Sequence, residues 1–382
     1  MDGQLSCKEL SLKYFNTRKV VATLFVLFEL VLISGVVGAA DGQENDGVKQ
    51  ASVGLAHIKS NQLSTTQISI LKPRDNLFAI TPLTEKSYLL AANNGLLVKV
   101  KDNVVYEKID LETNNDLLSI HATDSGEVLL GTDKGGLFVS KGELKNWSKV
   151  EVETNESIFN FTEQATGEVV MLGSYGLFMS SRPPYQQWEP VKIPWADFLK
   201  DAWDEFGEAA PHLYSGCNNE RGELLVVGEF GLALRRDVAG HWSKVHGGSI
   251  EPSMYGCDIS SDGENIILVG QKGLTYLTSN GGETWVKSDI SKGKDLYKVG
   301  KIRDLSVIIG DKKTIYTSLT SSEWVCQRFI GERPLGWFVD MAISEKEMAV
   351  IGSNGSFKVA EYSSLLSFIN KLNTSKELVS CE

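Results

Sequence analysis

The chain contains few prolines and few cysteines, and it has fewer positively than negatively charged residues. Nine prolines stand against 36 glycines in 382 residues, a balance that favours many tight turns over disordered linkers. The 38 Lys and Arg residues are outnumbered by 49 Asp and Glu residues, which gives a formal net charge of −11. Because phosphate binding needs clustered Lys and Arg, this balance argues against nucleic acid as a partner. The 42% of hydrophobic residues is enough to build a substantial core.

The five cysteines do not form the pattern of a disulfide scaffold or of a zinc site. Cys7 lies near the N-terminus, and the other four are spread over the chain without a C-x-x-C pair. The five histidines form no H-x-x-x-H or H-x-H arrangement. Phosphate-loop and nucleophile-elbow motifs are missing as well. We therefore expect no metal, no cofactor and no catalytic residues.

The N-terminal residues 1–40 have the features of an export signal. A positively charged leader precedes an apolar run from Val20 to Ala40, and a polar stretch follows it. Gly38 and Ala40 suit the −3 and −1 pockets of a signal peptidase. Glu29 interrupts the run and the leader is long, so an uncleaved membrane anchor is the alternative. Both interpretations place the rest of the chain outside the cytoplasm, in a periplasm or an equivalent lumen.

A pattern of short apolar runs recurs seven times. Each copy has a run that ends near glycine, followed by a glycine–hydrophobic step, with an aromatic or apolar opening before it. The markers of the step are Gly95, Gly136, Gly176, Gly231, Gly273, Lys313 and Gly355. They are 41, 40, 55, 42, 40 and 42 residues apart. A tryptophan follows the marker in five copies, at Trp147, Trp188, Trp242, Trp285 and Trp324.

This unit predicts four short strands separated by turns, in which glycine supplies the left-handed backbone of the hairpins. Four strands in about 40 residues is the size of one propeller blade. The sequence therefore predicts an all-β fold, a single seven-bladed β-propeller of four-stranded blades. The seventh copy lacks a fourth strand, whereas a β-like segment at 66–71 precedes the first copy. We expect this N-terminal strand to complete the last blade and close the ring.

The long step of 55 residues contains an insertion at 195–211, between the third and fourth blades. Trp195, Phe198, Trp203 and Phe206 fall on one face of an amphipathic helix bracketed by prolines. Packing over the rim of the two blades is the favoured interpretation of this face. The alternative makes the four aromatic residues a partner-binding element, because such side chains on a projecting helix are frequent anchors.

Cys217 and Cys257 occupy matching places in the fourth and fifth copies, so they belong to neighbouring first strands. A disulfide would need their Cα atoms within about 7 Å, and adjacent inner strands need not come that close. We therefore expect a buried pair of thiols, with a disulfide as the alternative. Cys326 and Cys381 carry no signal that predicts their pairing.

Residues 278–285, with the sequence Thr-Ser-Asn-Gly-Gly-Glu-Thr-Trp, look like the Asp-box hairpin of BNR repeats, with Asn280 in the Asp place. Together with the Val-Gly-x-x-Gly-Leu steps over residues 64–362, this resembles the photosystem II stability/assembly factor family. The resemblance implies an exported propeller that docks onto a membrane-protein complex through an arginine-rich face. The arginines available for such a face are Arg182, Arg221, Arg235, Arg236, Arg303, Arg328 and Arg333.

The predicted function is therefore that of an exported, non-catalytic scaffold or assembly factor, monomeric, which binds a membrane-protein complex or another envelope partner. The alternative is a carbohydrate-active propeller, either a sialidase-like glycoside hydrolase or a glycan-binding protein, because Asp-boxes also occur in sialidases. A sialidase-like site needs an arginine triad and a tyrosine nucleophile paired with glutamate. No arginine lies between Arg74 and Arg182, which argues against that site. The expected organisation is a signal or anchor at 1–40, a linker at 41–63, the propeller at 64–362 and a C-terminal helix and tail at 363–382.

Overall fold

The computed structural model describes residues 62–63, 74–142, 144–207, 210–248, 251–329 and 333–375. All of them belong to the larger of the two compact units into which the chain divides, Val48–Glu382. The export signal at 1–40, the closing segment at 66–71 and Cys381 lie outside the described residues, so the predictions made for them stay predictions. Within the described ranges no helix has both the length and the apolar character that crossing a bilayer requires.

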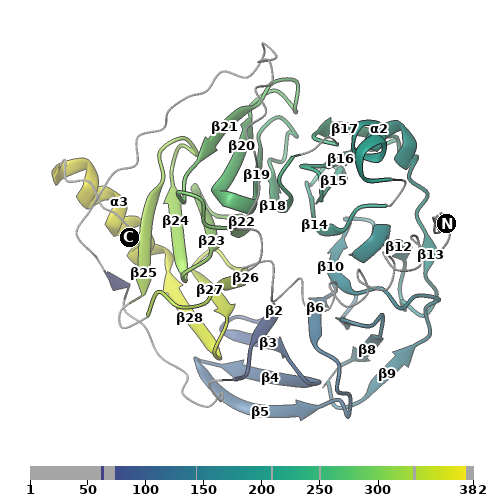
Figure 1. The fold of residues 1–382 in the computed structure, drawn as a ribbon. Helices are drawn as coiled ribbons and strands as arrows, with labels where there is room; N and C mark the ends of the chain where they lie inside the picture. Colours follow the sequence, from purple (N-terminus) through teal and green to yellow (C-terminus); the bar gives the residue numbers. More distant parts are fainter. Residues whose placement is uncertain are drawn as a thin grey trace, which may run out of the picture. The chain divides into compact units, whose positions relative to one another are not determined.

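Seven sheets with antiparallel neighbours follow one another along the chain (Figure 1). The first three contain β2 (Leu77–Thr84), β3 (Ser87–Ala92), β4 (Leu96–Lys101) and β5 (Val104–Asp110); β6 (Leu117–Ala122), β7 (Glu127–Thr132), β8 (Leu137–Lys141) and β9 (Trp147–Val150); and β10 (Ile158–Glu163), β11 (Val169–Gly173), β12 (Phe178–Ser181) and β13 (Glu189–Pro190). The fourth and fifth contain β14 (Leu213–Asn218), β15 (Leu224–Gly228), β16 (Ala233–Arg236) and β17 (Trp242–His246); and β18 (Met254–Ile259), β19 (Ile266–Gly270), β20 (Leu274–Thr278) and β21 (Val286–Asp289). The last two contain β22 (Leu296–Ile302), β23 (Leu305–Gly310), β24 (Thr314–Ser318) and β25 (Val325–Phe329); and β26 (Phe338–Ile343), β27 (Glu347–Gly352) and β28 (Ser356–Glu361). The other described elements are β1 (Gln62–Leu63), α2 (Trp195–Phe206), α3 (Tyr362–Ser375) and 3-10 turns at Ser174–Gly176 and Gln271–Gly273.

The predicted seven-bladed propeller is confirmed. The first strands of the sheets contact one another in a closed order, β2, β6, β10, β14, β18, β22, β26 and back to β2, so they surround the central axis. The second strands are the most deeply buried, since each is flanked by strands of its own sheet and by neighbouring sheets on both faces. This placement explains why the apolar runs of the repeat show no alternation with polar residues.

The recurring glycine step is a tight hairpin between the second and third strands. Asn94 and Gly95 both have positive φ, 54° and 71°, which is the geometry of a type I′ turn. At the sixth copy Lys312 and Lys313 adopt the same conformation, with φ of 55° and 54°. Lys313 therefore takes the place of the marker glycine, as the repeat predicts, in a conformation that is costlier for a side chain.

The Asn280 hairpin has the side-chain cap expected of it. Asn280 Oδ1 accepts a hydrogen bond from the Thr284 backbone N–H at 3.0 Å, and Asn280 Nδ2 donates to Thr284 Oγ1 at 2.9 Å. The indole of Trp285 donates to the Val245 carbonyl of the fourth sheet at 3.0 Å. This tryptophan therefore joins the fourth and fifth sheets.

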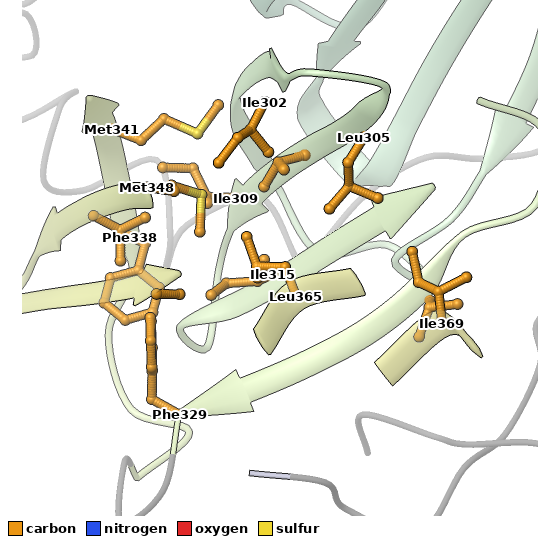
Figure 2. Packing of buried hydrophobic residues seen from close by; sticks show 14 residues of the cluster. Ile302, Leu305, Ile309, Ile315, Phe329, Phe338, Met341, Met348, Leu365 and Ile369 are labelled. Atoms are coloured by element: carbon orange, nitrogen blue, oxygen red, sulfur yellow. The ribbon is translucent and has the colours of Figure 1, made fainter. Parts of the chain in front are cut away.

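The closure of the ring is described only in part, because the segment at 66–71 that is predicted to complete the seventh sheet lies outside the described residues. The described N-terminal strand β1 pairs in parallel with β25 of the sixth sheet, and the described part of the seventh sheet has three strands. None of the described residues before β2 forms a strand of the seventh sheet. The chain passes directly from β28 into α3, whose apolar side chains Leu365 and Ile369 are buried against the sixth and seventh sheets (Figure 2). The helix buries apolar surface of these two sheets.

Backbone and side-chain contacts join the seventh and first sheets at the seam of the ring, where the Gly355 N–H donates a hydrogen bond to the Asp75 carbonyl at 2.5 Å. Asp340 Oδ2 accepts a hydrogen bond from the Ile80 backbone N–H at 3.0 Å, and Tyr88 Oη donates to Glu347 Oε1 at 2.6 Å. Phe357 is buried and packs against Tyr88, with the two ring centroids 5.8 Å apart. Apolar packing and polar contacts thus join the first and last blades.

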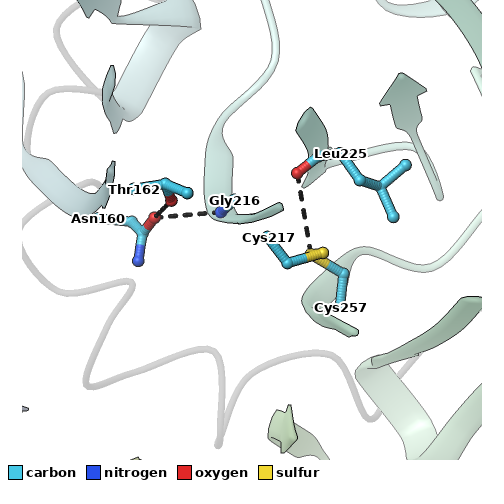
Figure 3. The surroundings of a disulfide bond; sticks show 6 residues. All are labelled: Asn160, Thr162, Gly216, Cys217, Leu225 and Cys257. Atoms are coloured by element: carbon cyan, nitrogen blue, oxygen red, sulfur yellow. Dashed lines mark hydrogen bonds between the residues drawn. A yellow bond between two sulfur atoms is a disulfide. The ribbon is translucent and has the colours of Figure 1, made fainter. Parts of the chain in front are cut away.

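The prediction that Cys217 and Cys257 are a pair of free thiols is wrong, because the two residues form a disulfide (Figure 3). Their Cα atoms are 6.0 Å apart, within reach of such a bond. Cys217 lies on β14 and Cys257 on β18, so the bond ties two neighbouring first strands together. Cys326 on β25 is disulfide-bonded too.

Candidate functional site

Every first strand carries a β-bulge at the same place, close to its beginning. The pairing register with the second strand slips by one residue there in all seven sheets. The bulged residues are Phe78, Leu118, Phe159, Tyr214, Tyr255, Tyr297 and Val339. A bulge re-aims the side chain of the extra residue away from the regular alternation of the strand. Five of the seven re-aimed side chains are aromatic, all at the leading end of the ring, where the first strands begin.

Four of these rings form a continuous row on consecutive blades, the aromatic arc of Phe159, Tyr214, Tyr255 and Tyr297. The centroids of Phe159 and Tyr214 are 5.8 Å apart, those of Tyr214 and Tyr255 5.0 Å, and those of Tyr255 and Tyr297 5.7 Å. All four side chains are half-buried. Spacings of this size are those at which aromatic pairs attract one another. The arc is therefore a preformed surface along one side of the leading end of the ring.

His212 and Tyr175 extend the arc outwards at the third and fourth blades. The two rings lie 4.7 Å apart, and the Tyr175 backbone N–H donates to His212 Nδ1 at 3.1 Å. His212 also lies 6.2 Å from Phe159 and from Tyr214. Because Tyr175 is on a hairpin of the third sheet and His212 begins the fourth, this contact fixes two blades relative to one another.

A reciprocal pair of hydrogen bonds holds the loop before most first strands. At the sixth sheet the Asp311 N–H donates to the Asp295 carbonyl at 2.9 Å, and the Asp295 N–H donates to Asp311 Oδ2 at 3.3 Å. A Cβ on Gly310 would lie 2.2 Å from that same Asp295 carbonyl oxygen, which explains the glycine that ends the second strand. The corresponding side-chain acceptors elsewhere are Asn93, Asp133, Ser174, Glu229 and Ser353. These bonds keep the leading end rigid.

Two carboxylate pairs flank the aromatic arc, one on the second blade and one on the sixth. Asp311 Oδ1 accepts a hydrogen bond from Tyr297 Oη at 2.9 Å, which joins one pair directly to the arc. Burial raises the pKa of Asp311 and of Asp295, and the charge of Asp311 adds to the rise at Asp295. On the second blade, burial and the neighbouring Asp116 raise the pKa of Asp133. The leading end therefore combines aromatic faces with desolvated acidic groups.

The tyrosine–glutamate pairs of the described chain do not resemble a glycosidase nucleophile. Tyr88, Tyr185 and Tyr276 each donate a hydrogen bond to a glutamate, and all three side chains are buried. Burial raises the pKa of each phenol, so the nucleophilic phenolate is disfavoured. Among the described residues no group of three His, Cys, Asp or Glu side chains could hold a metal ion.

The predicted partner-binding residues lie where the sequence places them, on the helix α2 between the third and fourth sheets. Trp195, Phe198 and Trp203 are half-buried and pack against the buried Leu232 and Leu234 of the fourth sheet. The structure does not describe the side chain of Phe206. Three of the four aromatic residues therefore pack on the rim of the propeller, as the favoured interpretation expects. A role of this face in partner binding stays a prediction.

Replacing Trp195 or Trp203 with alanine separates the two interpretations of α2. We expect each change to lower the free energy of unfolding by about 2 kcal/mol, because a half-buried indole loses its packing on the fourth sheet. Affinity for a ligand of the aromatic arc should not change. Chemical denaturation and a binding titration measure the two effects, with Lys200→Ala on the exposed face of α2 as control. Lost affinity at unchanged stability would favour the docking interpretation.

Four of the seven arginines suggested by the family resemblance lie away from the arc. Arg221, Arg235, Arg236 and Arg303 lie at the opposite, trailing end of the ring and bond to neighbouring sheets. Arg236, for example, forms an ion pair with Glu168 of the third sheet at 3.1 Å. These side chains join blades to one another.

The aromatic arc was not predicted from the sequence, although its four residues stand near the opening of their repeats. The aromatic residues near the opening of each repeat served there as strand markers. Their recurrence at the same position was the available signal. What the sequence does not contain is the register slip that turns these rings towards one another.

No protein-family model and no curated protein matches the chain. Among solved structures, it is similar to YCF48 bound to D1 peptide, with a TM-score of 0.62 and 12% identity over 81% of this chain and 99% of that one. YCF48 from Cyanidioschyzon merolae gives a TM-score of 0.62 and 14% identity over 78% and 98%. Virginiamycin B lyase from Staphylococcus aureus gives 0.61 and 8% over 78% and 99%. At these identities the likeness establishes the fold alone, and with it the architecture that the repeat predicts.

Proposed function

We propose that this chain is an exported, non-catalytic scaffold or assembly factor that binds a segment of a protein partner at the leading end of its propeller. The observation that carries the proposal is the aromatic arc, four half-buried rings in contact on four consecutive blades. Aromatic side chains held in a rigid frame bury much surface at little entropic cost, and they dominate the energetics of protein interfaces. The reciprocal hydrogen bonds beneath the arc supply that frame.

Two further observations support the proposal. One structure to which the fold is similar is that of YCF48 bound to D1 peptide, a propeller with a peptide ligand. The Cys217–Cys257 disulfide accords with an oxidising compartment, where such bonds persist, and hence with export of the chain. A membrane-protein complex as the source of the bound segment, and a monomeric propeller, belong to the same proposal.

Glycan binding is the second candidate, because stacked aromatic faces also bind the apolar faces of sugars. The aromatic arc is the observation that favours it. Hydrolysis is the less favoured form of this candidate, since the tyrosine–glutamate pairs are buried.

A peptide-display selection against the exported chain, run beside a glycan array, tests the proposal. We expect peptides to be selected, and their affinity to fall about tenfold when Tyr255 is replaced by alanine, as for an aromatic anchor at an interface. Val238→Ala is the matched control, because Val238 is exposed at the trailing end. Selection of glycans instead of peptides, or equal peptide affinity of the Tyr255→Ala variant, would contradict the proposal.

A further inference from the structure

Four blades share one contact between their tight hairpin and the next blade. The first residue of the hairpin between the second and third strands donates its backbone N–H to the side chain that directly precedes the next first strand. These donor and acceptor pairs are Asn94 and Asp116 Oδ1, Tyr175 and His212 Nδ1, Lys272 and Asp295 Oδ1, and Asn354 and Asn76 Oδ1, with distances of 3.1, 3.1, 2.7 and 3.1 Å. We call this contact the hairpin clamp, because it ties each of these hairpins to the neighbouring blade.

His212 differs from the other three acceptors, because an imidazole titrates near neutral pH. The oxygen of Asp or Asn accepts a hydrogen bond throughout the range of about pH 5 to 8, whereas a histidine nitrogen accepts only while it carries no proton. Since the Tyr175 N–H donates to Nδ1, the His212 ring is neutral here and has its proton on Nε2. A proton on Nδ1 would set two N–H donors against each other, so protonation opens this clamp.

Glu229 offers the protonated ring a different partner. Its Oε1 atom lies 3.9 Å from His212 Nε2, and its Oε2 atom accepts the His212 backbone N–H at 2.8 Å. A second carboxylate, Glu156, approaches the hairpin at Ser174, whose Oγ donates to it at 2.8 Å. Negative charge on both carboxylates stabilises a positive imidazole, so acid selects a ring that is paired with Glu229 and released from Tyr175.

We propose that the hairpin clamp of His212 makes peptide binding by the aromatic arc depend on pH, with tight binding while the ring is neutral and weaker binding once it is protonated. This inference rests on the function proposed above and adds its regulation. The His212 ring lies 4.7 Å from the ring of Tyr175 and 6.2 Å from those of Phe159 and Tyr214. An open clamp therefore leaves the outer end of the arc in place but less well ordered, which lowers affinity.

Fluorescence anisotropy at about pH 7.5 and pH 5.5 tests the inference with a selected peptide that has blocked ends and no titratable side chain. We expect the affinity of the parent to fall about fivefold on acidification. His212→Asn should abolish most of this fall, because an asparagine at the same place, Asn76, accepts the same hydrogen bond without titrating. The readout is the ratio of the two affinities within each protein, so a change in basal affinity does not enter it.

Two comparisons assign the pH dependence to His212. His241→Asn removes an exposed histidine at the trailing end and should keep the ratio of the parent. His246 and the acidic residues of the leading end titrate in the parent and in His212→Asn alike, so the difference between these two ratios belongs to His212.

Hydrogen exchange of single amides reports the clamp without any peptide. After correction for the intrinsic rate at each pH, protection of the Tyr175 amide should be about tenfold lower at the acidic pH in the parent. The amide of Asn354, whose acceptor is Asn76, should keep its protection and serves as the internal control.

The outcomes separate this inference from the function beneath it. An equal fall of affinity in the parent and in His212→Asn, or the same Tyr175 protection at both pH values, would overturn the pH-dependent clamp and leave peptide binding intact. An empty display selection would overturn the proposed function and with it the regulation of binding, even where exchange at Tyr175 still responds to pH.

Discussion

Replacing both Cys217 and Cys257 with serine should lower the free energy of unfolding by about 4 kcal/mol. The two residues are separated by 40 positions, so the disulfide closes a long loop that contains most of the fourth blade. Without the bond, the unfolded chain gains the conformational freedom of that loop. The folded state loses little, because serine fits the space of cysteine.

Denaturant titration of the oxidised proteins measures this effect. The single variant Cys217→Ser is the control, since it breaks the same bond while keeping one thiol, and it should lose a similar amount. Val238→Ala at an exposed position should unfold like the parent. Coincident unfolding curves for the double variant and the parent would mean that the disulfide does not constrain the chain.

The same double substitution should also lower the affinity of the proposed binding site for peptides. Tyr214 and Tyr255, the closest pair of the aromatic arc, precede Cys217 and Cys257 on the two strands that the bond joins. Loss of the bond frees these strands to move relative to each other. We therefore expect peptide affinity to fall about threefold in the double variant, less than for Tyr255→Ala, because the rings remain but are less well ordered.

Replacing Phe357 with alanine should cost about 3–5 kcal/mol. Its side chain is 2% exposed and packs where the seventh sheet meets the first, against Tyr88 among other residues. Truncation leaves a cavity at the seam between the seventh and first sheets. The cost should therefore appear as a lower free energy of unfolding, measured by chemical denaturation.

A second, milder variant tests whether the loss of stability comes from the seam between the seventh and first sheets. Phe357→Leu keeps most of the buried volume and should lose about 1 kcal/mol. Proteolysis should reveal cleavage near β2 or β28 in Phe357→Ala before the rest of the ring is cut, because the seam opens first. Uniform cleavage with unchanged stability would mean that the ring closes by other means.

The blade count and the hairpins are properties of the sequence alone. Seven copies of one unit, with glycine at the hairpin and tryptophan near the fourth strand, specify seven similar sheets. The conformation of Lys313 illustrates this, because a lysine in the place of glycine still adopts a positive φ of 54°. The spacing of Trp195, Phe198 and Trp203 likewise determined a helix, since local periodicity shows which side chains share a face.

Contacts between blades were decided by the tertiary structure. Whether Cys217 and Cys257 pair depends on the distance between two neighbouring strands, and the sequence does not encode that distance directly. The packing of α3 against the last two sheets depends on which of several apolar segments fits the space beside them. The aromatic arc depends on bulges, which are slips in register that leave the residue pattern of the strand unchanged. Local pattern determined the blades of this protein, whereas geometry between distant residues determined its seam, its disulfide and its candidate site.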